Sequence, residues 1–277
     1  MYSDILLCVD FDRTLTALDG SIPERNIEAI RHFIANGGKF TVNTGRTYVS
    51  FLPFLDIVPI NAPLLLMNGS GCWDSGNLQN FAPLEVDVWP IVRQLQADYP
   101  GVNFELQTLD THYLVDPTPS YAAYYQRRGL PHQIADPEKH KGPFLKIGIY
   151  GDDEHREEGS DSVTKAALFD RIEETLNREL DNSLVALRAT PLIINIHAKG
   201  ASKLTAARNL QKKLGRKFLV CVGDEGNDVP MLQGADFAFC PSDGAVAADF
   251  PNVCPCSQGA VADVIYEKIP QWLKMQK

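Results

Sequence analysis

Residues 5–14 read Ile5-Leu6-Leu7-Cys8-Val9-Asp10-Phe11-Asp12-Arg13-Thr14. The five consecutive apolar residues predict a β-strand covered on both faces, as in a parallel sheet that lies between helices. Two carboxylates, Asp10 and Asp12, follow this strand at once. Ligands of open parallel sheets bind at the carboxyl ends of the strands, and the period of two in an extended chain predicts that both carboxylates point to one side. The stretch therefore indicates an α/β fold and marks its functional edge.

The strand-then-helix pattern recurs on both sides of the middle of the chain. Apolar runs predict further strands at residues 40–42, 64–67, 218–222 and 237–239. Helix-length segments with apolar stripes separate these runs, so right-handed crossovers and a parallel sheet are expected. Ser21-Ile22-Pro23-Glu24 has the pattern of a capping box with proline in the first turn.

The middle of the chain has a different pattern. Apolar residues alternate with polar ones at Phe104 and Leu106 and again around Lys146 and Gly148, which predicts a sheet with one polar face. Two further strands are expected at residues 184–189 and 192–196. We therefore predict a discontinuous parallel-sheet domain over residues 1–83 and 191–277, with an α+β domain inserted over residues 84–190. The acidic residues 152–161 are expected to form a solvated loop.

The composition limits the partners of the protein. The chain has 277 residues, of which 44% are hydrophobic and 22% charged, and a net charge of −9, so nucleic acid and anionic membrane surfaces are not expected as partners. No apolar run reaches the roughly 20 residues that span a bilayer, and residues 1–4 do not begin a leader peptide, so a cytoplasmic location is expected. Among six scattered cysteines, the spacing of Cys254-Pro255-Cys256 is typical of neither a zinc nor a redox site.

Two more segments carry side chains that suit phosphoryl transfer. Thr44-Gly45-Arg46 follows the predicted strand at residues 40–42, and Lys203 begins a helix that Ser202 is expected to cap. Transfer through an aspartyl phosphate requires a nucleophilic carboxylate, a second carboxylate, a hydroxyl and a cation. Taken alone, Thr44 is explained as well by an ordinary helix cap, and Lys199 competes with Lys203 for the role of the amine.

An acidic cluster follows the predicted strand at residues 218–222. Asp224, Asn227 and Asp228 lie within five residues, at the start of a helix. An acid at a helix start complements the helix dipole, which explains Asp228 but not an acid placed directly after a buried strand. Oxygen ligands for a hard cation explain both, because Mg²⁺ binds to a few carboxylates together with water and phosphate. Mg²⁺ is therefore the expected cofactor.

On these residues the chain resembles the haloacid dehalogenase superfamily of phosphohydrolases, and within it the Cof-type, sugar-phosphatase-like branch with a large C2-type cap. The matching motifs are residues 10–16 (DFDRTLT), Thr44-Gly45-Arg46, Asn68-Gly69, Ser202-Lys203 and residues 223–232 (GDEGNDVPML). An ordered set of this kind is far more specific than any single motif. The resemblance implies an α/β fold with a Rossmann-like parallel-sheet core and an inserted α+β cap domain.

The resemblance also implies a role for each core residue. Asp10 would be the nucleophile, and Asp12 the general acid and base. Thr44 and Lys203 would complete the catalytic set by holding the transferring phosphoryl group. The implied metal ligands are Asp10, Asp12 through its backbone carbonyl, Asp224 and Asp228, and the implied substrate contacts are Thr44, Gly45, Arg46, Lys203 and Asn227.

The resulting hypothesis is a Mg²⁺-dependent phosphatase that hydrolyses small phosphorylated metabolites, such as sugar phosphates, through an aspartyl phosphate. A phosphomutase or phosphotransferase of the same superfamily uses the same intermediate and is the alternative enzyme. A non-catalytic binding protein is a third possibility. Such a protein is expected to have lost the nucleophile or a metal ligand, but this sequence keeps all of these residues. The sequence leaves the physiological substrate and the oligomeric state open.

The sequence departs from the family pattern at two places and carries one further cluster. Arg13 stands where many members have glycine, and Pro241-Ser242-Asp243 stands where this branch often has Gly-Asn-Ala. Aromatic and basic residues gather in the predicted insert, and any of them is a candidate substrate contact. They are Tyr113, Tyr121, Tyr124, Tyr125 and Arg127-Arg128, of which Tyr121 and Tyr125 are expected, from helical spacing, to pack in the core of the insert.

Overall fold

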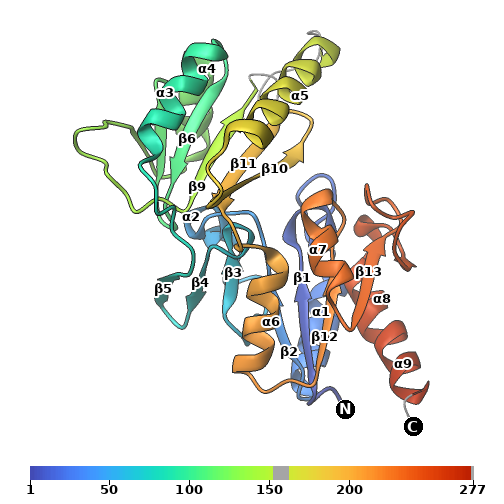
Figure 1. The fold of residues 1–277 in the computed structure, drawn as a ribbon. Coiled ribbons are helices and arrows are strands. Elements are labelled where there is room, and N and C mark those ends of the chain that lie inside the picture. The colour runs from blue at the N-terminus through green and yellow to red at the C-terminus, as the bar shows by residue number, and fades with distance from the viewer. Residues whose placement is uncertain (152–161, 276–277) are drawn as a thin grey trace. The chain divides into compact units, whose positions relative to one another are not determined.

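The computed structural model describes residues 1–151 and 162–275, and within them the chain forms two compact units (Figure 1). Unit 1 comprises residues 1–46, residues 51–79 and the chain from Ser202 onward, and unit 2 comprises residues 47–50 and 80–201. The predicted insert at residues 84–190 has different limits, and its boundaries stay a prediction. The acidic residues 152–161, expected as a solvated loop, lie outside the described residues.

Unit 1 is built on a five-stranded sheet with the order β14-β13-β12-β1-β2. Every neighbouring pair in it is parallel, as predicted. β1 lies between β2 and β12, so both of its edges are paired. All five of its residues are buried. The strands are β1 (Ile5–Val9), β2 (Lys39–Val42), β12 (Phe218–Val222), β13 (Phe237–Pro241) and β14 (Asn252–Val253).

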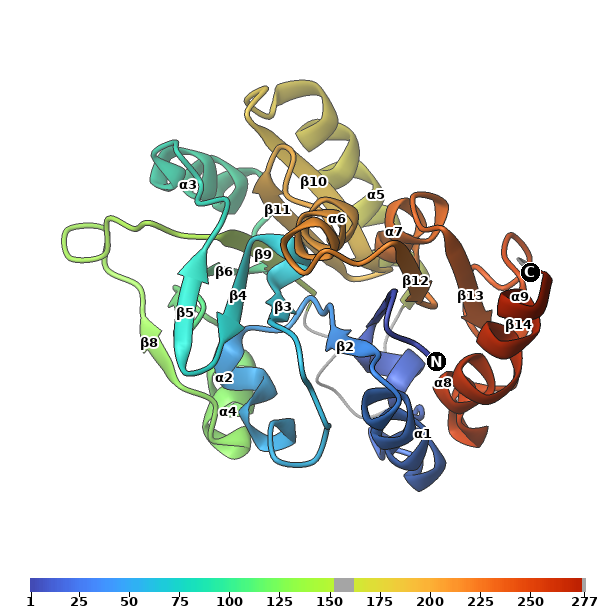
Figure 2. The same ribbon diagram turned by 90° about the horizontal axis from the view of Figure 1, so that it is seen from below.

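Helices cover both faces of this sheet, as Figure 2 shows, with α6 and α7 on one side and α1, α8 and α9 on the other. Alternate residues of β1 and β12 pack against the first pair, where Leu6 and Cys8 share an apolar cluster with Leu210 and Met231. The α/β class predicted from the apolar runs is confirmed. The helices are α1 (Glu24–Ala35), α6 (Lys203–Lys213), α7 (Val229–Gln233), α8 (Ala260–Asp263) and α9 (Ile269–Met275).

The two predicted helix caps have different outcomes. The Ser202 hydroxyl accepts a hydrogen bond from the backbone N–H of Thr205 at 3.1 Å, so this cap is confirmed. The capping box at Ser21 is wrong. Helix α1 begins at Glu24 after Pro23 without a side-chain cap, and the Ser21 hydroxyl donates to Asp19 Oδ1 at 2.6 Å instead. The aspartate two residues away offers the hydroxyl a local acceptor, which competes with the helix start.

A separate, small three-stranded sheet follows β2 in the sequence. Its strands are β3 (Leu64–Leu66), β4 (Gly71–Asp74) and β5 (Asn77–Asn80). The pairing of β3 with β4 is antiparallel, and an isolated parallel bridge between Asn43 and Leu65 joins β3 to the chain after β2. The short helix α2 (Tyr48–Phe51) precedes this sheet. In the described chain, no helix is long and apolar enough to cross a bilayer.

Unit 2 contains a six-stranded sheet with the order β10-β11-β9-β6-β7-β8. Its pairs are antiparallel except for β7 with β8. Apolar side chains of one face, among them Phe104, Ile147 and Ile194, join a core cluster with residues of α3 and α5. The strands are β6 (Asn103–Gln107), β7 (His112–Val115), β8 (His132–Ile134), β9 (Lys146–Tyr150), β10 (Leu184–Thr190) and β11 (Ile193–Ala198), and the helices are α3 (Val88–Asp98), α4 (Pro119–Arg128) and α5 (Ser162–Glu179).

The other face of the sheet in unit 2 is polar, and a buried carboxylate lies at its centre. Glu105 on β6 is fully buried. It accepts hydrogen bonds from Gln107 Nε2 at 2.6 Å, from the hydroxyls of Tyr125 at 2.6 Å and Tyr121 at 2.9 Å, and from His112 Nδ1. Tyr121 and Tyr125 therefore do pack inside the unit, as their helical spacing predicted, and they also satisfy a charge there.

This network predicts an acid-sensitive contribution to stability. Burial alone would raise the pKa of Glu105, but His112, Tyr125 and Lys146 outweigh burial and lower the pKa from 4.5 to about 2. A carboxylate with a depressed pKa in the folded protein contributes stability that is fully present above pH 4.5 and is lost as the pH falls from 4.5 towards 2. We expect the protein to lose on the order of 3 kcal/mol across this window from Glu105 alone.

Urea unfolding between pH 6 and pH 2.5 measures this contribution. In Glu105→Gln the free energy of unfolding should be lower at pH 6 and should fall less steeply with acid than in the unmodified protein. An equal pH dependence in the two proteins would show that Glu105 carries no shifted pKa.

Candidate active site

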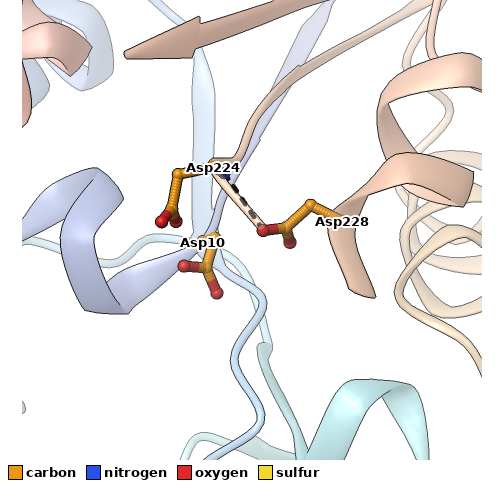
Figure 3. A group of neighbouring side chains, drawn as sticks. All are labelled: Asp10, Asp224 and Asp228. Carbon is orange, nitrogen blue, oxygen red and sulfur yellow. Dashed lines mark hydrogen bonds between the residues drawn. The ribbon is translucent and has the colours of Figure 1, made fainter. Parts of the chain in front are cut away.

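Three buried carboxylates converge at the carboxyl ends of β1 and β12. Asp10 follows β1 directly, Asp224 lies two residues after β12, and Asp228 ends the helical turn before α7. Because β1 and β12 are paired, their ends place Asp10 and Asp224 side by side (Figure 3). One carboxylate oxygen from each of the three residues lies within 4.8 Å of the other two. The structure thus brings together three of the four predicted metal ligands.

The loop after β12 is held by the carboxylate of Asp228. Asp228 Oδ2 accepts hydrogen bonds from the backbone N–H groups of Asp224 at 3.1 Å and Glu225 at 3.2 Å, the first of which is drawn in Figure 3. A Cβ atom at Gly223 would lie 2.6 Å from the Asp228 side chain, so only glycine fits there. The close turn between Gly223 and Asp228 therefore aims both carboxylates at Asp10.

Lys203 supplies the cation of the site. Its ammonium donates to Asp10 Oδ1 at 2.5 Å and to Asp228 Oδ1 at 2.6 Å, and the residue is only 2% exposed. Burial alone would lower the pKa of Lys203, but Asp10 and Asp228 raise it, so the amine stays charged. The structure thus places Lys203 among the acidic residues, as expected. The competitor Lys199 belongs to unit 2.

The carboxylates carry more negative charge than Lys203 offsets. Burial raises the pKa of Asp10 well above its usual range, and Asp228, Asp224 and Asp12 add to the rise, although Lys203 opposes it. Burial also raises the pKa of Asp224 to about 7, with Asp228 contributing, although a hydrogen bond from Thr14 lowers it. A cation bound among these oxygens would return both groups to the ionised form. All three donors are carboxylate oxygens, and this set fits a hard divalent cation.

Thr14 is a site residue to which the sequence assigned no role. Its hydroxyl donates to Asp224 Oδ1 at 2.6 Å, and the side chain is fully buried. The hydrogen bond fixes one oxygen of Asp224 and leaves the other for a cation. The only available signal was its place in the DFDRT motif, in the helical turn that follows Asp10.

Asp12 does not lie among the other carboxylates. The strand ends at Val9 and residues 11–15 form a helical turn, in which Arg13 has a φ of 60°. Asp12 itself keeps an extended backbone, with φ −74° and ψ 128°, and the chain turns only after it, so the prediction that its side chain shares the side of Asp10 stays a prediction. The carboxylate is half exposed and accepts two hydrogen bonds from Arg46, from Nε at 2.9 Å and from Nη2 at 2.6 Å. Arg46 thus pairs with the second carboxylate of the motif.

The remaining predicted contacts form a second group around Asn68. Thr44 is buried, and its hydroxyl accepts a hydrogen bond from the backbone N–H of Arg46 at 3.1 Å, a bond within the loop, because the next helix, α2, begins only at Tyr48. Asn227 Nδ2 donates to Asn68 Oδ1 at 3.3 Å. A Cβ atom at Gly45 would lie 3.3 Å from the same oxygen. Gly45 and Asn227 therefore both border Asn68.

Asn43 fixes the start of the helix that carries Lys203. Its Nδ2 donates to the backbone carbonyl of Lys203 at 2.8 Å, and the side chain is fully buried. A Cβ atom at Gly69, whose φ is +91°, would lie 2.3 Å from the carbonyl oxygen of Ser202, so the chain approaches this helix start closely. The sequence alone gives Asn43 no role, although it directly precedes Thr44.

The departures from the family pattern have structural partners. Arg13 Nη1 pairs with Glu225 Oε1 at 2.8 Å. Asp243 accepts hydrogen bonds from the backbone N–H of Cys256 at 2.9 Å and from its Sγ at 3.2 Å, and burial raises the pKa of this thiol to about 11. Cys256 is therefore held as a neutral thiol. All six cysteines are free.

Comparison with known proteins agrees with this geometry. The chain is 26% identical over 234 residues to the 5-amino-6-(5-phospho-D-ribitylamino)uracil phosphatase YcsE of Bacillus subtilis (strain 168). The aligned region covers 83% of this chain and 80% of that relative. A haloacid dehalogenase-like hydrolase from Bacteroides thetaiotaomicron has a similar structure, with a TM-score of 0.77, 19% identity and coverage of 97% of this chain and all of that one. A sugar phosphatase of HAD subclass IIB has a TM-score of 0.72 at 18% identity, with 98% and 99% coverage.

The two similar structures show that the chain shares their fold. The family is shown by a match along the sequence. Residues 7–248, which include every motif of the site, match the family profile of the haloacid dehalogenase-like hydrolases. With its parallel-sheet core and its cluster of Asp10, Asp224, Asp228 and Lys203, the chain belongs to the haloacid dehalogenase-like hydrolase family and is an enzyme of the hydrolase class.

Proposed function

We propose that this enzyme is a Mg²⁺-dependent phosphatase that hydrolyses small phosphorylated metabolites through an aspartyl phosphate. The observation that carries the proposal is the placement of Lys203 between Asp10 and Asp228, with Asp224 completing the acidic group. A buried ammonium beside a buried carboxylate is suited to hold the negative oxygens of a phosphoryl group next to an oxygen nucleophile.

In the first step Asp10 attacks phosphorus, the bond to the leaving oxygen breaks, and Asp12, protonated and released from its pairing with Arg46, gives its proton to that oxygen. In the second step Asp12 takes a proton from water, the water oxygen attacks the aspartyl phosphate, and Asp10 and inorganic phosphate are released. Lys203 and Thr44 hold the phosphoryl oxygens in both steps. The exposure of Asp12 supports its role, because a group that exchanges a proton with water must be reached by water.

Asp10, Asp224 and Asp228 would hold the metal, together with the backbone carbonyl of Asp12. When bound, a divalent cation neutralises charge at the transferring phosphoryl group. The choice of Mg²⁺ rests on the donor set, which consists of oxygens alone. Thr14 keeps one oxygen of Asp224 occupied and so orients the other.

The substrate class rests on the relatives. YcsE acts on a phosphorylated sugar alcohol attached to a pyrimidine, and a structural neighbour is a sugar phosphatase. We therefore propose a small phosphorylated compound with a hydroxylated carbon skeleton. A panel for this enzyme would contain phosphorylated sugars, sugar alcohols and nucleotides, with 5-amino-6-(5-phospho-D-ribitylamino)uracil among them.

Metal removal is the first test. With 4-nitrophenyl phosphate as substrate, we expect hydrolysis to stop when EDTA is added and to return when excess Mg²⁺ restores free metal, because three clustered carboxylates repel the phosphoryl group without a cation. Circular dichroism before and after EDTA would control for unfolding. Undiminished turnover in EDTA would exclude the metal-dependent mechanism.

The product separates the alternatives. A phosphatase releases inorganic phosphate from a labelled sugar phosphate, whereas a phosphomutase returns an isomer that still carries the label. A protein that binds the panel members but converts none of them in Mg²⁺ would be a binding protein.

A further inference from the structure

A loop that carries none of the proposed catalytic residues lies against one of the proposed metal ligands. It comprises residues 242–246 and directly follows β13, the neighbour of β12 in the main sheet. Because β12 and β13 are parallel, their carboxyl ends lie at the same edge of the sheet. This loop therefore begins beside the one that carries Asp224. We call residues 242–246 the supporting loop.

Two contacts join the supporting loop to Asp224. The backbone N–H of Val246 donates a hydrogen bond to the backbone carbonyl of Asp224 at 3.2 Å. A Cβ atom at Gly244 would lie 3.0 Å from the Cβ atom of Asp224 and 2.7 Å from Cys240 Sγ. Carbon and sulfur atoms do not pack so closely, and Cys240 is fully buried, so a methyl group at this position would force its neighbours to move.

Asp224 is consequently held on two sides. The Thr14 hydroxyl donates to Asp224 Oδ1 at 2.6 Å, and the supporting loop packs against the Cβ atom and bonds to the main chain. The residue is only 1% exposed. Because these contacts fix both the base of the side chain and one of its oxygens, they also set the direction in which the second oxygen points.

The carboxylate of Asp243 anchors the supporting loop. Its Oδ1 accepts a hydrogen bond from the backbone N–H of Cys256 at 2.9 Å, and its Oδ2 accepts one from Cys256 Sγ at 3.2 Å. Cys256 is 1% exposed and begins a short helical turn, Cys256–Gln258. The backbone N–H of Gly244 donates to the carbonyl of Pro241 at 2.9 Å and closes the turn after β13. The side chain of Asp243 thus ties the loop to a buried part of unit 1.

We propose that Gly244 and Asp243 are positioning residues for the metal site. Gly244 leaves the space that Asp224 needs, and Asp243 holds the loop against it. Both residues act through Asp224, one oxygen of which is kept free for the cation. The inference rests on the proposed function, because it gives the loop a part in holding the proposed Mg²⁺.

Gly244→Ala tests the space that glycine leaves. We expect the dissociation constant for Mg²⁺, measured by calorimetry on the full chain, to rise roughly tenfold, because groups that orient metal ligands typically change metal affinity by about 10–100-fold. The matched control is Gly226→Ala in the acidic loop itself. A Cβ atom at Gly226 would meet nothing within 4 Å, so this variant should keep the dissociation constant.

A kinetic measurement separates positioning from a general loss of stability. With 4-nitrophenyl phosphate, the Mg²⁺ concentration that gives half of the maximal rate should rise in Gly244→Ala by the same factor as the dissociation constant. The rate at saturating Mg²⁺ should change much less, because the displaced carboxylate still binds when metal is in excess. A variant that is only less stable would lose activity at every Mg²⁺ concentration and keep the half-maximal one.

Two substitutions of Asp243 separate its position from its charge. Asp243→Asn removes the charge and keeps an oxygen that accepts from the backbone N–H of Cys256, whereas Asp243→Leu removes both. We expect the dissociation constant for Mg²⁺ to rise more in Asp243→Leu than in Asp243→Asn. An equal rise in the two variants would mean that Asp243 acts through its charge alone, and its role as an anchor would be overturned.

The outcomes for this inference and for the proposed function are distinct. Unchanged Mg²⁺ binding in Gly244→Ala and Asp243→Leu, both folded by their melting temperatures, would overturn the inference and leave the proposed function intact. Should Gly244→Ala not fold, the two Asp243 variants decide the inference. If the unmodified protein binds Mg²⁺ but hydrolyses no phosphate, only the proposed function is overturned, since the binding comparison still applies. Absence of Mg²⁺ binding in the unmodified protein would overturn both.

Discussion

Asp10→Asn is expected to lower turnover of 4-nitrophenyl phosphate by roughly 10⁴-fold or more, because the amide cannot attack phosphorus and no other carboxylate takes its place. The nearest alternatives are constrained. Asp224 is bonded to Thr14, and Asp228 holds two backbone N–H groups and Lys203. Initial rates in excess Mg²⁺ measure the effect.

The substitution also touches the metal site, so the nucleophile and ligand roles must be separated. A Mg²⁺ titration does this, since a ligand defect is overcome at high metal concentration and a missing nucleophile is not. The control is Asp249→Asn, which makes the same change at an exposed carboxylate of unit 1 and should leave turnover unchanged. Recovery of full activity in Asp10→Asn at saturating Mg²⁺ would reduce Asp10 to a metal ligand.

Lys203→Met is expected to destabilise the protein as well as to disable it. Removing one partner of a buried ion pair typically costs about 3–5 kcal/mol, because a buried charge is left without compensation. Here the amine serves two carboxylates, Asp10 and Asp228, that are 6% and 1% exposed. Loss of the cation at the phosphoryl group should lower turnover by roughly 10²–10³-fold as well.

Mg²⁺ should rescue the stability of this variant more than its activity. A divalent cation among the carboxylates replaces the missing positive charge, so the rise in melting temperature on adding Mg²⁺ should be larger in Lys203→Met than in the unmodified protein. Lys213→Met is the matched control, since Lys213 lies on the same helix and pairs with Asp74 at 3.4 Å on the surface, where such pairs contribute about 0–1 kcal/mol. Equal melting temperatures for the two variants in EDTA would contradict the role of Lys203 as the cation of the buried group.

The site could be predicted where the signal is local. An acid at or just beyond the end of a buried apolar strand marks the edge of a parallel sheet, so Asp10 and Asp224 could be assigned to one edge once both strands were recognised. Their adjacency follows from the pairing of β1 with β12, which joins residues more than 200 positions apart. The ordered motifs of a known family indicated that β1 and β12 pair. The hydrophobic periodicity of the sequence did not indicate it.

Local pattern also leaves some partners and turns unseen. Asp12 keeps an extended backbone before the left-handed Arg13, and its partner Arg46 comes from another segment of the chain. The hairpin of β4 and β5 was missed although Ser75-Gly76 is a dipeptide that marks turns. In the structure both residues have positive φ and lie between short strands, as a two-residue hairpin turn requires.

The network around Glu105 could not be predicted from local pattern. In the sequence Glu105 is one polar residue between Phe104 and Leu106, which predicts only that it faces away from the apolar side. Its partners come from β7 and α4 and from its own strand, and nothing in the spacing of His112 or Tyr125 indicates that they meet one carboxylate. Tertiary contacts decide this network, so it becomes visible only with the fold.

The central position of β1 has a consequence for synthesis of the chain. β1 is translated long before one of its partners: β2 follows it closely, yet the strand that pairs with its other edge, β12, lies at residues 218–222. Until that segment emerges, the row of N–H and C=O groups on one edge of β1 has no native partner, and such open edges template misassembly. All of unit 2 is translated during this interval. Nascent chains that end before residue 218 are therefore the stage at which this protein most needs a chaperone.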